Sequence, residues 1–118
     1  VADDEELQQM QRESEETFIH DSIYRYMVAL SDATRKHPAL ELGLSPRGTL
    51  ALGKMARAYA FLCEREYVVP QDVQKALTDV GIHRIRLNQK ARLNGKTAAD
   101  ILKEILNRVP VPKPGEKY

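Results

Sequence analysis

The amino-acid sequence predicts an all-α protein, a small bundle of four or five helices with at most one short two-strand ribbon. Several segments repeat apolar residues at intervals of three and four, the spacing of one helix face, and most begin or end at recognisable capping residues. The 118 residues allow one domain with one core. A content of 42% hydrophobic and 30% charged residues is typical of a globular protein, and no stretch approaches the roughly 18 apolar residues of a membrane span.

Residues 1–16 form a strongly acidic segment. They hold seven acidic residues against one basic residue, Arg12, which is a net charge of −6 in a chain whose formal charge is +1. The acids at positions 3–6 suit a helix N-terminus, so we expect an acidic linker or linker helix here. The domain itself is expected to span residues 17–109. Because the chain begins at Val1 without a signal peptide, we expect a piece of a longer chain.

A helix is predicted to begin near Asp21 and to end before Pro38, because the residue before proline avoids the helical region. Its apolar stripe is expected to contain Ile23, Tyr24, Met27, Val28, Leu30 and Thr34. Residues 17–19, just before it, are β-prone and expected to be extended. The loop 37–44 keeps several leucines, so we expect it to pack against the bundle. Gly43 is expected to supply a positive φ there.

The best-defined element is a helix predicted over residues 46–65. Ser45 is a good N-cap, and Pro46 suits the first helical position, where no amide donor is needed. Apolar residues cover most sides of this segment, so we expect it to be the enclosed hub of the bundle. They are Leu52, Met55, Ala56, Tyr59, Ala60 and Cys63, with a second row of Ala51, Ala58 and Leu62.

Cys63 is the single cysteine of the chain. It cannot form an internal disulfide, so we expect a reducing compartment, the cytoplasm. Since no thiolate-stabilising neighbour is evident, a small core residue is the favoured interpretation over a nucleophile.

The second half of the sequence predicts two further helices. Residues 66–69 look extended and are expected to pair with residues 17–19 as the short ribbon. Pro70 opens the next helix, which Gly81 is expected to weaken or bend. A polar loop is predicted over residues 88–96.

Thr97 then caps the final helix, and Asp100 stands at the capping-box position. Its buried edge is expected to contain Ile101, Leu102, Ile105, Leu106 and Val109. Residues 110–118 contain three prolines and are expected to form an extended tail.

Arg47 does not suit its predicted position. It is a cation in the first turn of a helix, beside free N–H groups and the positive end of the helix dipole. An anion such as phosphate at that end would explain it. A solvated surface arginine is the ordinary alternative, and the residues by themselves leave both open.

A second charged feature lies between residues 80 and 99, which contain five basic and no acidic residues. The bases are Arg84, Arg86, Lys90, Arg92 and Lys96. This basic run could meet nucleic acid or another polyanion, face solvent, or meet an acidic neighbour. No aromatic residue interrupts it, so base stacking is not indicated. One alternative function is therefore a free-standing helical module that binds nucleic acid or protein through residues 84–96.

Motifs for catalysis are not evident in this chain. It has no phosphate-binding loop and no paired carboxylates. His20, His37 and His83 stand far apart, so no metal site is expected, and His83 is more often the packed, hydrogen-bonded kind of histidine. The isolated chain is not expected to be an enzyme.

Six stretches, in order and spacing, resemble the C-terminal helical lid of the MoxR-type AAA+ ATPases, in the magnesium-chelatase-like branch. The resemblance covers residues 17–112, about four fifths of the chain. The stretches are Tyr26-Met27-Val28-Ala29-Leu30 with Ala33-Thr34-Arg35-Lys36-His37-Pro38, then Leu42-Gly43-Leu44-Ser45-Pro46-Arg47, Glu66-Tyr67-Val68-Val69-Pro70-Gln71-Asp72-Val73, His83-Arg84-Ile85, Gly95-Lys96-Thr97 and Val109-Pro110-Val111-Pro112.

The resemblance implies a role for Arg47 as the sensor 2 residue, with Ser45 and Pro46 on the phosphate side of ATP. It further implies ATP and Mg²⁺ in a parent protein that hydrolyses ATP, with neither held firmly by this chain. The implied partners are the AAA+ core domain of the same chain, neighbouring subunits of a hexameric ring and a protein with a von Willebrand factor A domain. The implied role is that of a cytoplasmic chaperone that matures enzyme complexes or inserts cofactors or metals, without a membrane or nucleic-acid partner.

The chain departs from the family pattern at three points. Glu64 precedes Arg65 where the family often has glycine, so a glycine turn is absent. Val69 stands where Ser or Thr usually caps the next helix, so that side-chain cap is missing. Gly81 lies where a bulky residue is common. These departures put the local geometry in question at each point.

Overall fold

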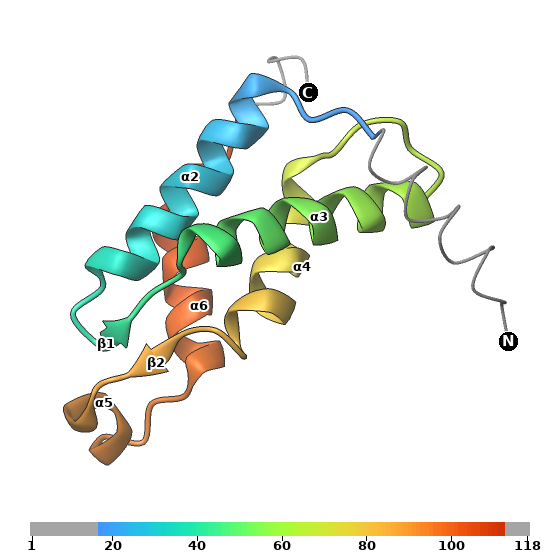
Figure 1. The fold of residues 1–118 in the computed structure, drawn as a ribbon. Helices are drawn as coiled ribbons and strands as arrows, with labels where there is room; N and C mark the ends of the chain where they lie inside the picture. The colour runs from blue at the N-terminus through green and yellow to red at the C-terminus, as the bar shows by residue number, and fades with distance from the viewer. Residues whose placement is uncertain (1–16, 113–118) are drawn as a thin grey trace, which may run out of the picture.

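The structure, a computed structural model, describes residues 17–112. The acidic segment 1–16 and the last part of the proline-rich tail lie outside the described residues. The described part is a five-helix domain with one small sheet, so the all-α class is confirmed (Figure 1). Its elements are α2 (Asp21–Lys36), β1 (Leu40–Leu42), α3 (Pro46–Leu62), α4 (Pro70–Gly81), β2 (Arg86–Leu87), α5 (Gln89–Leu93) and α6 (Ala98–Arg108).

Helix α2 begins at Asp21 and ends before Pro38, as predicted. Its N-cap, which was not predicted, is His20, whose Nδ1 atom accepts a hydrogen bond from the Ser22 backbone N–H at 3.1 Å. The buried face is narrower than predicted, because Tyr24 and Val28 are exposed. They lie about 100° around the helix from the residues that point into the core. The buried residues are Ile23, Tyr26, Met27, Leu30, Ser31 and Thr34.

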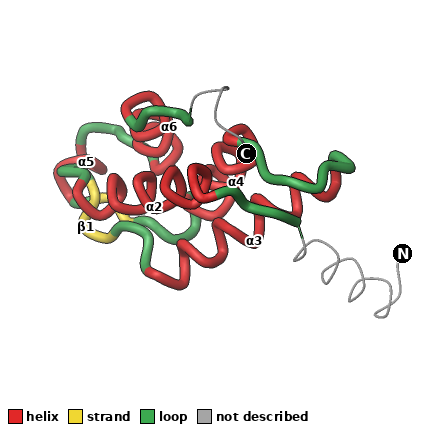
Figure 2. Tube along the Cα trace, turned by 90° about the horizontal axis from the view of Figure 1, so that it is seen from above, coloured by secondary structure: helices red, strands yellow, loops and turns green. Residues whose placement is uncertain are grey.

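Helix α3 has the predicted start but is not an enclosed hub. The Ser45 hydroxyl accepts from the Gly48 N–H at 3.1 Å, and Pro46 occupies the first turn. Its buried apolar residues are Leu52, Ala56 and Ala60. The second apolar row is not enclosed, because Ala51 and Ala58 are half-buried and Leu62 is 66% exposed. Figure 2 shows α3 on one side of the bundle and α6 on the other, with α2 and α4 between them.

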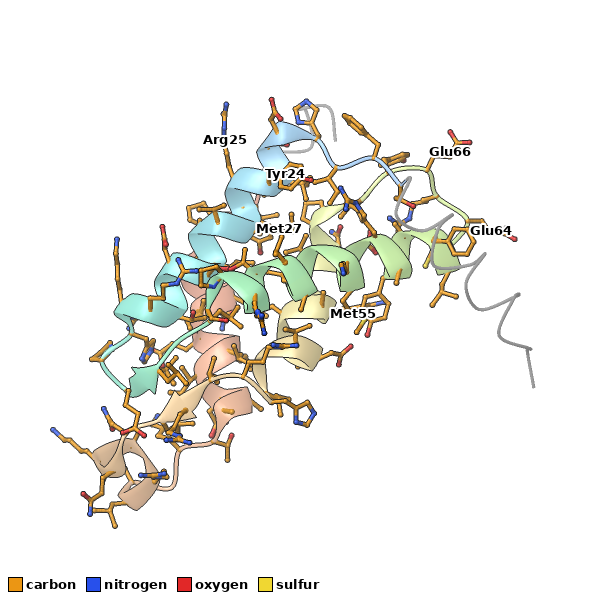
Figure 3. All side chains as sticks on the ribbon, viewed as in Figure 1. Tyr24, Arg25, Met27, Met55, Glu64 and Glu66 are labelled. Atoms are coloured by element: carbon orange, nitrogen blue, oxygen red, sulfur yellow. The ribbon has the colours of Figure 1, made fainter. Side chains whose placement is uncertain are left out.

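The end of α3 is a Schellman motif three residues earlier than predicted. The Glu64 N–H donates to the Phe61 carbonyl, and the Arg65 N–H donates to the Ala60 carbonyl, both at 2.9 Å. Glu64 takes a positive φ of 58° and so fills the left-handed position that the family usually gives to glycine. Figure 3 shows Glu64 at the end of α3 and Glu66 further along the connection to α4. Cys63 is the C-cap and is exposed, so its assignment to the core was wrong.

Helix α4 ends at Gly81 and does not continue through residues 83–87. A Cβ atom on Gly81 would lie 2.9 Å from both methyl carbons of Leu102. The absence of a side chain therefore lets the end of α4 approach α6 closely. The predicted capping box of α6 is confirmed: the Thr97 N–H donates to Asp100 at 3.0 Å, and the Asp100 N–H donates to Thr97 at 3.2 Å.

The small sheet lies elsewhere than the predicted ribbon. Strands β1 and β2 pair antiparallel, with Leu40 opposite Leu87 and Leu42 opposite Arg86. The segments expected to form the ribbon meet in a single parallel bridge between Phe18 and Tyr67. Strands of two or three residues are too short for an alternating pattern to be recognised in the sequence.

Helix α5 lies inside the predicted polar loop 88–96. It is short, and its start is held by Asn88, whose Oδ1 atom accepts from the Ala91 N–H at 2.9 Å.

One core is shared by α2, α3, α4 and α6. Its largest fully buried side chains include Ile23, Leu30, Leu52, Leu77, Ile101 and Ile105. Leu106 and Val109, predicted for the buried edge of α6, are only partly buried against this core. Because the four helices pack on one core, the short connections between them are enough to fix where α3 begins.

Candidate functional site

The predicted site residues Ser45, Pro46 and Arg47 lie together at the exposed start of α3. The first turn contains no acidic residue. Within residues 17–112, neither the guanidinium nor the backbone N–H of Arg47 has a hydrogen-bond or ion-pair partner. Both groups are donors, and they stand at the positive end of the helix dipole. The arrangement can bind an anion.

The last turns of α2 hold the chain just before this start. The Leu44 N–H donates to the Thr34 hydroxyl at 2.9 Å, and that hydroxyl donates to the Ser31 carbonyl at 2.6 Å. Arg35 donates from Nε to the Leu44 carbonyl at 2.7 Å. Leu44 and Thr34 are buried, so the bonds of the Thr34 hydroxyl are shielded from water, whereas the bond from Arg35 is only partly buried. The residue before the N-cap is therefore fixed by both its backbone groups.

A second set of bonds joins α2 to the first turn of α3. The Thr49 hydroxyl lies 2.9 Å from the Ser31 hydroxyl and 3.4 Å from Nη2 of Arg35. Arg35 also pairs with Asp32 at 3.0 Å, which orients its guanidinium. The sequence analysis placed none of these α2 residues in a functional role. The sequence shows that these residues are polar and recur at helical spacing. It does not show their bonding partners, which are distant in sequence.

Gly43 is required by close packing, not by a positive φ as predicted. Among the described glycines only Gly95 has a positive φ. A Cβ atom on Gly43 would lie 2.6 Å from the Arg35 backbone nitrogen and 2.6 Å from the Thr34 carbonyl carbon. The strand-to-helix connection thus passes directly over the backbone of α2. This contact sets the direction in which α3 leaves the loop.

A groove of about 350 Å³ runs beside the α3 start, between α2 and α3. Its walls are mostly apolar, and the exposed side chains of Val28 and Leu50 belong to it. The lining residues are Val28, Ser31, Arg35, Pro46, Thr49 and Leu50.

The basic run 84–96 is exposed and extends over the turn after α4, β2, α5 and the following loop. Arg86 pairs with Glu41 of β1 at 3.7 Å. Arg84 lies apart from the rest of the run because its side chain packs on α3. Its Cδ atom would lie 3.6 Å from a Cβ atom placed on Gly48. The sequence analysis counted Arg84 in the run and missed this contact.

The histidines have other surroundings than predicted. His83 is exposed, so its expected packing was wrong. His37 is the buried one: its Nδ1 atom accepts from the Ala39 N–H at 3.0 Å, and its Nε2 atom lies 3.4 Å from Glu104. Over residues 17–112, no group of three His, Cys, Asp or Glu side chains could hold a metal ion.

Helices long and apolar enough to cross a membrane are not found within residues 17–112.

The fold of residues 17–112, five helices with one two-strand antiparallel sheet, is that of a helical lid domain. The chain belongs to the AAA lid domain family, whose model matches residues 32–105. The resemblance to the lid of MoxR-type ATPases drawn from the sequence motifs is thereby confirmed.

Relatives agree with this family assignment. The chain is 43% identical over 103 residues to the uncharacterized protein YeaC of Bacillus subtilis, covering 87% of this chain and 32% of that protein. It is 30% identical over 117 residues to the chaperone MoxR1 of Mycobacterium tuberculosis, covering 92% of this chain and 31% of that protein. The crystal structure of an ATPase candidate from Cytophaga hutchinsonii superposes with a TM-score of 0.80 at 30% identity, over 86% of this chain and 34% of that one. The chain therefore spans about a third of the length of these relatives.

Proposed function

We propose that this chain is the lid of a MoxR-type AAA+ ATPase in which Arg47 is the sensor 2 residue. In this role its guanidinium donates hydrogen bonds to the phosphate oxygens of ATP that is bound by the core domain of the same protein. The observation that carries the proposal is the exposed, unpaired state of Arg47 on a helix start that is itself tightly held. Ser45 and Pro46 contribute by fixing the first turn.

The donors at the α3 start fit a phosphate group in chemical type. A planar guanidinium offers N–H donors in a fork that matches two oxygens of one phosphate. The free backbone N–H of Arg47 adds a further donor beside it. A fixed cation at this place stabilises the negative charge that develops on the phosphate oxygens during phosphoryl transfer. The first turn contains no carboxylate, so Mg²⁺ would be held by acidic groups of the core domain.

The bonds from α2 support this role because they reduce the motion of the arginine's backbone. Thr34 and Arg35 hold Leu44, and Ser31 contacts Thr49 in the first turn. A cation that is already in position when the reaction begins can stabilise the transition state with little free-energy cost for rearranging the site. A movement of the lid relative to the core would then carry Arg47 toward or away from the phosphates as one rigid unit.

The same proposal places the protein in the cytoplasm, in a hexameric ring with neighbouring subunits. A chaperone role in maturing enzyme complexes, or in inserting cofactors or metals, fits the relative named chaperone MoxR1. A protein with a von Willebrand factor A domain is the proposed partner of the ring. The compartment, the ring, the chaperone role and this partner are all properties of the parent protein, and each goes beyond the assignment of the chain as a lid.

Nucleic acid is not part of the proposed function. The basic run includes Arg86, which is paired with Glu41, and no aromatic residue interrupts the run to stack on bases. Binding of the chain to duplex DNA should therefore be weak at about 0.15 M salt, near the level of non-specific attraction. Tight binding whose affinity falls steeply with salt, and which is lost in Lys90→Glu, Arg92→Glu, would favour the nucleic-acid module instead.

The experiment that tests the function compares the 118-residue chain with the full-length protein. The chain alone should not hydrolyse ATP, whereas the full-length protein should. Introducing Arg47→Ala into the full-length protein should remove most of that activity, while a substitution at the exposed Arg25 should leave it unchanged. Turnover by the rigorously purified chain alone would contradict the assignment as a lid.

A further inference from the structure

We infer that Arg84 is a second arginine that binds the phosphates of the same nucleotide as Arg47. The inference rests on the proposed function of the α3 start. It is carried by a contact between two segments distant in sequence: the turn after α4 and the first turn of α3. Arg84 is therefore assigned as a binding residue for a nucleoside polyphosphate.

The backbone of Arg84 is fixed from both sides. Its N–H donates to the Gly81 carbonyl at 3.0 Å, and the N–H of Ile85 donates to the same carbonyl at 3.0 Å. Ile85 is buried, and Leu87 pairs with Leu40 in the sheet. The turn after α4 is thus held to the core on one side and to β1 on the other.

The sheet brings this turn to the start of α3. Strand β1 leads through Gly43 and Leu44 into the N-cap of α3, and β2 follows Arg84 after one residue. Pairing of β1 with β2 therefore brings the turn before β2 toward the segment that leads from β1 into α3 (Figure 1). The helix start and the turn share one small framework, so they would move together when the lid moves.

The side chain of Arg84 lies across Gly48 in the first turn. A Cβ atom on Gly48 would lie 3.6 Å from Cδ of Arg84 and 2.8 Å from Cδ2 of Leu44. Gly48 is buried beneath these two side chains, although Arg84 itself is exposed. The aliphatic stem therefore packs on the first turn of α3, while the residue as a whole stays open to solvent.

The charges at this place would attract an anion. Within residues 17–112, Arg84 and Arg47 have no hydrogen-bond or ion-pair partner for their guanidinium groups. Neighbouring arginines do: Arg35 pairs with Asp32 at 3.0 Å and Arg86 with Glu41 at 3.7 Å. Two like charges at the positive end of a helix repel each other and the helix dipole.

A ligand with several negative charges removes this repulsion. A nucleoside di- or triphosphate has them spaced along one chain, so two arginines from different segments can each contact a different phosphate. Arg84 would then contribute to ground-state binding of the nucleotide, while Arg47 contributes more to hydrolysis. This division predicts different kinetic effects for the two residues.

The test measures equilibrium binding of a fluorescent ATP analogue to the full-length protein. Arg84→Ala should weaken binding roughly 10- to 100-fold, the usual cost of losing a charged hydrogen bond. Arg84→Met keeps the aliphatic stem without the charge and should be as weak, whereas Arg84→Lys should recover part of the affinity. Arg86→Ala is the matched control, because Arg86 is exposed nearby and paired with Glu41, and should bind as the parent does.

Circular dichroism melts of each variant establish that the fold is retained. Unchanged affinity in the folded Arg84→Met and Arg84→Ala proteins would overturn the inference. If Arg47→Ala impairs hydrolysis and these variants bind normally, this inference alone fails. If Arg47→Ala is also without effect, the proposed function fails with it.

Discussion

Arg65 and Asp72 form a two-pronged ion pair that fastens the end of α3 to the start of α4. Nη1 of Arg65 lies 2.6 Å from Oδ2 of Asp72, and Nη2 lies 2.8 Å from Oδ1. The same Oδ2 atom accepts from the Val69 N–H at 3.0 Å, which is the half of a capping box that the third helical residue supplies, while the valine side chain has no acceptor for the other half. The hydrogen bonds that Arg65 donates to Asp72 raise the pKa of its guanidinium above the ordinary value. The pair therefore ties the residues after α3 to the first turn of α4.

Loss of this pair should destabilise the domain. Asp72 is only 3% exposed, so Arg65→Ala leaves a buried carboxylate without its cation. We expect the free energy of unfolding in urea to fall by about 3–5 kcal/mol, the usual cost of breaking a buried pair from one side. Arg25→Ala, on the exposed side of α2, is the control and should change it by roughly 0.5 kcal/mol or less. A loss below about 1 kcal/mol in Arg65→Ala would show that the pair is solvated.

Glu64 offers the opposite prediction. It holds a positive φ of 58° in the Schellman motif, a conformation that is costly for a residue with a side chain. Glu64→Gly should therefore stabilise the chain by about 0.5–1 kcal/mol, despite the greater freedom of glycine in the unfolded state. Glu66→Gly, two residues later, lacks this benefit and should be neutral or destabilising. In thermal melts only Glu64→Gly should have a higher melting temperature than the parent, and a lower melting temperature for Glu64→Gly would contradict the strain argument.

Gly43 and Gly53 form a matched pair for testing the packing of the site. At Gly43 a Cβ atom would lie 2.6 Å from backbone atoms of α2, whereas at Gly53 it would meet nothing within 4 Å. Gly43→Ala should cost about 1–3 kcal/mol, because the backbone must shift. Gly53→Ala should instead stabilise by roughly 0.5–1 kcal/mol, since glycine in a helix interior is unfavourable. Equal urea midpoints for the two variants would disprove the close approach of Gly43 to α2.

Asp100 predicts a pH dependence at the start of α6. Hydrogen bonds from the backbone and then the side chain of Thr97 lower the pKa of the Asp100 carboxyl below its ordinary value of 3.8. Because the pKa is lower in the folded state, the ionised carboxylate stabilises the fold at pH values above the pKa of the unfolded chain. This stabilisation is lost as the pH falls through the pKa of the folded state. Between about pH 5 and pH 2 the parent should lose its stability advantage over Asp100→Asn. A constant difference over that range would rule out this titration.

The helices followed from the sequence where the signals are local. Two helix starts were predicted correctly because their capping residues lie within four positions of one another. They are Ser45 with Pro46 at α3, and Thr97 with Asp100 at α6. The sheet was not predicted, since its strands have two and three residues and pair across more than forty positions. The exposure of Cys63 was missed because the helical pattern of α3 continues past the point where the Schellman motif ends the helix.

The candidate site was predictable only in part. Arg47 could be recognised because a cation in a first helical turn conflicts with the local electrostatics. The hydrogen bonds that join Thr34 and Arg35 to Leu44 could not be predicted, because they depend on how α2 packs against the loop before α3. The contact of Arg84 with Gly48 depends on the unpredicted sheet. Residues that act through packing across the fold leave no periodic signal in the sequence.

The central claim is that Arg47 acts on the phosphates of ATP and is not needed for folding. The most direct test measures ATP hydrolysis by the full-length protein with and without Arg47→Ala. In parallel, the free energy of unfolding of the 118-residue chain is measured with and without the same substitution. Hydrolysis should fall on the order of 10³-fold, as for other arginines that clamp phosphates, while stability changes by roughly 0.5 kcal/mol or less. Arg47→Lys should recover only part of the rate, because an ammonium group keeps the charge and loses the fork. A folded, assembled Arg47→Ala protein that hydrolyses ATP at the parental rate would contradict the account.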